Sequence, residues 1–168
     1  MADETSARAL LAAVRERFAD ASNRLERVIA VLGPEELAFR ANAASNSAGN
    51  LVLHLCGHLD AAFLGEAARR DRAGEFLAEG PFDGAKLRAR TRTTFDALDR
   101  YLAGLDGDSL LEPKETPAGT TLLAALVYSL AHTTEHVGQV ILLAKAERPD
   151  ATPALWGTPV RQGKRPSP

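Results

Sequence analysis

The chain has 168 residues and a formal net charge of −2 at pH 7, which suits one domain with one hydrophobic core. Hydrophobic residues make up 45% and charged residues 25% of the sequence, a globular composition that argues against disorder as the main state. Aromatic residues make up only 5%, so we expect helices packed through Leu, Ala and Val rather than an aromatic-rich sandwich. The small negative charge attracts neither nucleic acid nor anionic lipid, and we expect neither as a partner.

Apolar residues at three- and four-residue spacing predict a first long helix over Ser6–Leu32, ended by Gly33-Pro34. Residues 34–37 predict a short helical turn. A second long helix is predicted from Ser47 to about Arg69, with capping residues at its start.

Residues 70–80 predict a connection of mixed charge, and Asp83 is the expected cap of a third long helix that extends to Leu105. The stretch 109–119 predicts either a short hairpin or irregular chain. A fourth long helix is predicted from Thr120 to Glu147.

We therefore predict an all-α fold, an up-down four-helix bundle with long connections over residues 1–148, followed by an extended Pro-rich tail over residues 149–168. The stretch 120–144 carries one formal charge, Glu135, and has the length of a membrane span. Its centre is too polar for a lone span, so we expect a helix buried inside the bundle.

All four histidines form two pairs at i, i+4 spacing, His54 with His58 and His132 with His136. This spacing places both rings of a pair on one helical face. Imidazole is a common ligand of divalent ions, and two pairs on facing helices predict a site for zinc or nickel, with iron or manganese as alternatives. The other interpretation is that the histidines satisfy one another as core residues.

Three polar residues share these helical faces and are predicted to contact a small-molecule substrate: Asn50 beside the first pair, and Tyr128 and Gln139 beside the second. Tyr128 at this spacing also suits the core. Glu135 is predicted either to orient an imidazole of a neighbouring helix from the second shell or to face solvent.

Cys56 is the only cysteine, so no internal disulfide forms, and the first residues do not resemble a signal peptide. We therefore expect a cytoplasmic protein, with Cys56 as a small buried hydrophobic residue. The nearly charge-free fourth helix has more apolar surface than a bundle needs, which predicts a homodimer.

A basic cluster between the second and third helices consists of Arg69, Arg70 and Arg72. Asp71 and Glu75 interrupt it, and no stacking aromatic residues accompany it. We interpret it as solvated surface rather than as a nucleic-acid site.

Three stretches resemble the DinB-like superfamily, also called YfiT-like metal-dependent enzymes: residues 35–37 with Arg40, residues 45–57, and the HxxxHxGQ pattern within residues 132–140. The resemblance covers residues 6–148. It implies a dimeric up-down four-helix bundle that holds a divalent metal through three histidines.

By this resemblance the metal ligands are His54, His132 and His136, and the activity is that of a transferase or isomerase using a low-molecular-weight thiol such as bacillithiol or mycothiol. Other members are described as hydrolases. Related sequences tend to have asparagine at His58, so His58 is a fourth ligand, a substrate contact, a general base or a structural residue.

A divalent ion at such a site lowers the pKa of a bound water or thiol. We take His58 as the candidate catalytic base, because a histidine that is not a ligand titrates near neutrality. A thiol S-transferase or isomerase is the favoured function. The alternatives are a metal-dependent hydrolase, a non-catalytic metal-binding bundle, and a stress-response module that binds ligand without metal.

Overall fold

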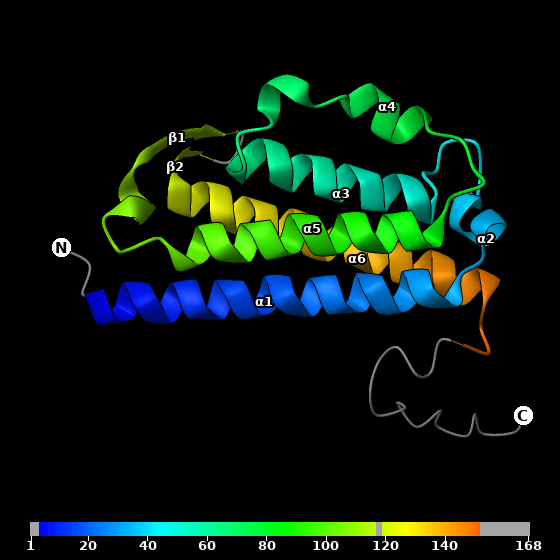
Figure 1. Cartoon of the computed structure of the whole chain (residues 1–168), viewed down its shortest axis with the longest axis horizontal. Helices are drawn as coiled ribbons and strands as arrows, with labels where there is room; N and C mark the ends of the chain where they lie inside the picture. Colours follow the sequence, from blue (N-terminus) through cyan, green and yellow to red (C-terminus); the bar gives the residue numbers. More distant parts are fainter. Residues whose placement is uncertain (1–3, 117–118, 152–168) are drawn as a thin grey trace, which may run out of the picture.

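The computed structural model describes residues 4–116 and 119–151 and is mostly helical, which confirms the all-α class (Figure 1). Four long helices lie side by side and enclose the core (Figure 1). They are α1 (Glu4–Val31), α3 (Ala48–Phe63), α5 (Gly84–Ala103) and α6 (Leu122–Glu147).

Shorter elements join these helices. A hairpin formed by residues 113–116 and 119–121 begins in the predicted connection and delays the start of the fourth long helix from Thr120 to Leu122; its antiparallel strands align Thr116 with Gly119. The hairpin alternative is therefore confirmed. The short elements are α2 (Pro34–Ala38), the 3₁₀ turns η1 (Ala67–Arg69) and η2 (Ser109–Leu111), α4 (Arg72–Leu77), and the strands β1 (Pro113–Thr116) and β2 (Gly119–Thr121).

Side-chain caps start two of the long helices where the sequence predicts. The Ser47 hydroxyl accepts the backbone N–H of Asn50, and the Asp83 carboxylate accepts the N–H of Ala85. The predicted end of the second helix at about Arg69 is wrong, because α3 ends at Phe63. Gly65 follows with a φ of +76°, a conformation that L residues with a side chain rarely adopt and that turns the chain away from the helix axis.

The long helices do not alternate in direction as the predicted up-down order requires. The ion pairs Arg15–Asp99 and Arg92–Glu26 join α1 and α5 in antiparallel fashion. Figure 1 shows that α3 and α5 both start at the end of the molecule where α2 lies, so these two helices run parallel. The reason is the connection over residues 64–83, which carries α4 back along α3 before α5 begins.

The core is built mainly from aliphatic side chains, as the composition predicts. One aromatic pair joins α1 to α5, Phe18 and Phe95, with ring centroids 6.4 Å apart. Large side chains that are almost fully buried come from all four long helices: Leu25, Ile29, Leu55, Leu59, Leu98, Leu102, Leu126 and Val140.

Within the described part of the chain, no helix has the length and apolar character needed to cross a membrane. The interpretation of residues 120–144 as a buried helix holds for one face of α6 only: Ser129 and Thr133 are buried, whereas Val127 and Leu142 are exposed. The predicted tail over residues 149–168 lies mostly outside the described residues.

Candidate metal centre

The two histidine pairs meet at the interface of α3 and α6. The Nε2 atoms of His54 and His132 are 3.1 Å apart, and the His54 ring centroid lies 5.1 Å from that of His136. One ring nitrogen from each of these three residues lies within 4.8 Å of the other two. The three histidines that the family resemblance implies as ligands are therefore brought together.

His54 is buried, and its second ring nitrogen contacts a carboxylate. Nδ1 of His54 lies 3.0 Å from Oε2 of Glu75. Arg70 binds the same carboxylate with both sides of its guanidinium, Nε to Oε1 at 2.9 Å and Nη2 to Oε2 at 2.9 Å. Since the carboxylate accepts a hydrogen bond from the Nδ1–H group, the lone pair of His54 lies on Nε2, which faces His132.

The interpretation of Arg70 and Glu75 as solvated surface is wrong. Their side chains are only 18% and 10% exposed, because α4 folds back onto α3. Gly57 permits this approach, since a Cβ on it would lie 2.0 Å from Oε1 of Glu75. Arg69 and Arg72 are exposed, as predicted.

Asn50 holds α4 in place on α3. It is fully buried, and its amide nitrogen donates to the backbone oxygens of Glu75 at 3.0 Å and Ala78 at 2.8 Å. Arg40 donates to the side-chain oxygen of Asn50 at 2.8 Å and to the backbone oxygen of Phe76 at 3.0 Å. Both ends of the Asn50 amide are thus engaged within the chain, so its contacts are structural rather than those of the predicted substrate-binding residue.

Aromatic rings surround the histidines. The Phe76 ring packs against His54 with centroids 4.5 Å apart, and Tyr128 stacks on His132 at 5.8 Å with an angle of 9° between the rings. Tyr128 is half-buried, so it borders the cluster as predicted. These rings add apolar surface to the border of the site.

His58 lies beside the cluster but outside the group of three. Its ring centroid is 4.6 Å from that of His132, while its Nε2 lies 2.9 Å from the hydroxyl of Ser129. Ser129 is buried. This arrangement favours a role other than ligand for His58, and its predicted role as a base stays a prediction.

Gln139 contacts a histidine of the cluster, whereas Glu135 faces solvent. The side-chain oxygen of Gln139 lies 2.9 Å from Nδ1 of His136, so Gln139 orients an imidazole. Glu135 is exposed, and none of the contacts among the described residues joins it to an imidazole. Of its two predicted roles the structure supports the solvent-facing one, and the carboxylate that contacts a histidine is Glu75.

His54, His58 and His132 are neutral at pH 7 in this environment, because their pKa values are lowered. Burial, followed by the charges of neighbouring groups, lowers the pKa of His132 to about 3 and that of His58 to about 4. The expectation that His58 titrates near neutrality is therefore wrong, because its ring is half-buried beside Arg70 and the other imidazoles. Burial also lowers the pKa of His54. Burial would raise the pKa of Glu75, but hydrogen bonds from Arg70 and His54 outweigh it and lower that pKa. His54 and His132 are therefore unprotonated imidazoles, the form that binds metal.

Cys56 takes no part in the cluster. It is fully buried in the core, and burial raises the pKa of its thiol to about 11. This confirms the expectation of a small buried hydrophobic residue.

The family model described as "Protein of unknown function (DUF1572)" matches residues 5–155, nearly the whole chain. The chain belongs to this family. No curated protein matches the sequence. Since the description of DUF1572 assigns no activity, the function of the chain has to be argued from the histidine cluster.

Proposed function

We propose that this DUF1572 protein is a divalent-metal-binding member of the DinB-like superfamily, with the four-helix-bundle fold of that group, and that it is a metal-dependent enzyme acting with a low-molecular-weight thiol. One observation carries the proposal: the ring nitrogens of His54, His132 and His136 lie within 4.8 Å of one another. The resemblance of residues 6–148 to DinB-like sequences supports the choice of reaction.

The three histidines fit a divalent ion in charge and in donor type. Uncharged imidazole nitrogens suit zinc and nickel, and also iron and manganese. Nδ1 of His54 hydrogen-bonds to Glu75, and Nδ1 of His136 hydrogen-bonds to Gln139. The Nε2 atom of each of these two rings therefore has a lone pair that can bind a metal. A bound ion would supply Lewis acidity that lowers the pKa of a water or thiol ligand.

Three protein ligands leave a position open for an exchangeable molecule, which is typical of catalytic rather than structural zinc sites. The residues around this position are then assigned by their contacts. Tyr128 and Phe76 border the space with the apolar surface of their rings. His58, whose Nε2–H we assign as donor to Ser129, keeps Nδ1 as the atom that accepts a proton from the substrate.

A metal-dependent hydrolase is the alternative, because the same proton acceptor at His58 would serve water as well as a thiol. The preference for the thiol rests on the family resemblance. The small-molecule substrate and the cytoplasmic location remain parts of this proposal.

The proposal also includes a homodimer formed through α6. Val127 and Leu142 on this helix are 58% and 68% exposed, which is unusual for large apolar side chains on a helix that already packs on two others. A monomer in sedimentation at micromolar concentration would contradict this part.

Cobalt substitution tests the proposed function. We expect the apoprotein to take up about one equivalent of Co²⁺ with visible absorption bands, and a low-molecular-weight thiol to add a sulfur-to-cobalt charge-transfer band. The zinc-loaded protein should then transfer the thiol to an electrophile faster than the His136→Ala variant does. Cobalt bands that thiols leave unchanged, together with ester hydrolysis, would favour the hydrolase. Cobalt uptake without turnover of either kind would favour a non-catalytic site.

A further inference from the structure

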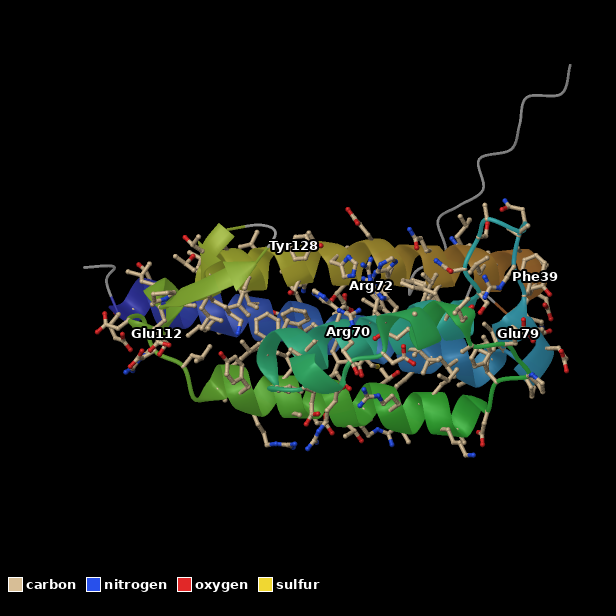
Figure 2. All side chains as sticks on the ribbon, turned by 90° about the horizontal axis from the view of Figure 1, so that it is seen from above. Phe39, Arg70, Arg72, Glu79, Glu112 and Tyr128 are labelled. Atoms are coloured by element: carbon tan, nitrogen blue, oxygen red, sulfur yellow. The ribbon has the colours of Figure 1, made fainter. Side chains whose placement is uncertain are left out.

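Arg72 is the exposed arginine at the first helical position of α4. Its guanidinium carbon lies 6.0 Å from the centre of the Phe76 ring, the ring that packs on His54. In the view of Figure 2, Arg72 lies between Arg70 and Tyr128. We infer that Arg72 binds a carboxylate of the substrate beside the histidine cluster, which makes the substrate a small carboxylate-bearing thiol.

The charges around the cluster support an anionic substrate. This step rests on the proposed function, because it assumes a divalent ion at the three histidines. The imidazoles bring no negative charge to that ion, and the one carboxylate that contacts them, Glu75, is paired with Arg70 on both oxygens. The residues around the ion therefore do not neutralise its positive charge, which favours a negatively charged exchangeable ligand.

Arg72 has no carboxylate partner within the described residues. Arg40 also contacts α4, but it donates to Asn50 and to backbone oxygens. Three arginines near α4 are paired with carboxylates, Arg69 with Glu66, Arg70 with Glu75 and Arg90 with Asp60. These paired residues line a groove of about 680 Å³ between α3, α5 and the connection. Because its charges already neutralise one another, that groove offers no anchor for an anion, whereas Arg72 does.

The Phe76 ring orients the Arg72 guanidinium, which lies over it. A guanidinium over an aromatic face is held by a cation–π interaction, and its planar donors remain free for two parallel hydrogen bonds to a carboxylate. Phe76 contacts both groups, the Arg72 guanidinium at 6.0 Å and the His54 ring at 4.5 Å. The proposed substrate extends from the histidine cluster to Arg72, with its sulfur at one end and its carboxylate at the other.

Two thiols of equal length test the inference on the cobalt-loaded protein: 3-mercaptopropionate and its methyl ester. We expect the parent to bind the acid roughly tenfold more tightly than the ester, as read from the charge-transfer band. Arg72→Gln should abolish this preference while cobalt affinity and ester affinity stay unchanged, and Arg72→Lys should restore part of it. Arg69→Gln is the matched control, because Arg69 is exposed and paired with Glu66, and it should keep the full preference.

The outcomes separate this inference from the function on which it rests. A parent that takes up cobalt and binds acid and ester equally overturns the role of Arg72 only. A preference for the acid that persists in Arg72→Gln also overturns it, because the carboxylate is then bound elsewhere. A parent that takes up no cobalt overturns the metal site itself, and the carboxylate anchor with it.

Discussion

The α1–α5 and α3–α6 interfaces are both antiparallel helix pairs, yet they are filled by opposite chemistry. Between α1 and α5, Phe18 and Phe95 meet in the interior, and charged groups such as the Arg15–Asp99 pair lie at the rim. Between α3 and α6 the interior contains four imidazoles and the Ser129 hydroxyl. One interface carries its polar groups outside, and the other carries them inside.

This difference shows what a polar interface needs in order to exist inside a small protein. Buried polar groups are costly unless they are hydrogen-bonded. The α1–α5 interface keeps its charged groups at the exposed rim, so two helices are enough to form it. The buried imidazoles of the α3–α6 interface require a third segment, which brings Glu75 and Arg70 to His54. We therefore assign fold stability mainly to the first interface and chemistry to the second, and the predictions below test that division.

The largest expected loss of stability comes from the apolar interface. Phe95→Ala should lower the free energy of unfolding of the metal-free protein by about 3–5 kcal/mol, because it removes a buried ring and leaves a cavity. Denaturant unfolding measures this loss. Zinc affinity of the folded variant should equal that of the parent, and a parallel drop in affinity would show that the two interfaces are not separable.

Removing the charge of Glu75 should weaken metal binding without removing a ligand. We expect Glu75→Gln to lower zinc affinity roughly 10- to 100-fold, as changes to groups that orient a ligating histidine do. Competition with a chromophoric chelator measures the affinity. Glu66→Gln is the control, since Glu66 pairs with exposed Arg69 and does not contact a histidine. Equal affinities in all three proteins would contradict the role of Glu75.

The pH dependence of stability should reflect the polar interface. The pKa values of His132 and His58 are about 3 and about 4 in the folded protein, whereas an unfolded histidine titrates near 6.5. The unfolded state therefore binds more protons below about pH 6.5, and metal-free stability should fall as the pH decreases from there toward 4, by at most about 1.4 kcal/mol per pH unit for each group. Urea unfolding across this range should give a shallower slope for His132→Ala, and an unchanged slope would contradict the assignment.

The smallest effect is expected at the rim of the apolar interface. Arg15→Ala should cost less than about 1 kcal/mol, because the side chains of Arg15 and Asp99 are 38% and 50% exposed and solvent screens exposed ion pairs. Thermal unfolding measures the change. A loss as large as that of Phe95→Ala would mean that surface charge, not the apolar interior, stabilises this interface.

The sequence predicts the helices and the histidine cluster because both depend on local spacing. The periodicity of apolar residues defines the four long helices, and the i, i+4 spacing places each histidine pair on one face. Facing helices then bring His54 together with His132 and His136.

The path of residues 64–83 could not be predicted in the same way, because distant contacts determine it. Glu75 and Arg70 lie in a stretch of mixed charge that locally resembles solvated surface. Hydrogen bonds from Asn50 and Arg40, together with the contacts of Glu75 and Phe76 with His54, fix this stretch on α3. The parallel direction of α5 follows from the same path. The one local signal was Gly57, a glycine within a helical pattern, which allows the close approach of Glu75.

Metal content tests the central claim most directly. Protein purified without a nickel column would be analysed by mass spectrometry as the parent, as His132→Ala and as the matched variant His58→Ala, each after incubation with zinc and removal of the excess. We expect about one equivalent of zinc in the parent and in His58→Ala, and loss of the ion in His132→Ala. Equal metal content in the parent and His132→Ala, or no metal in any of the three, would contradict this claim.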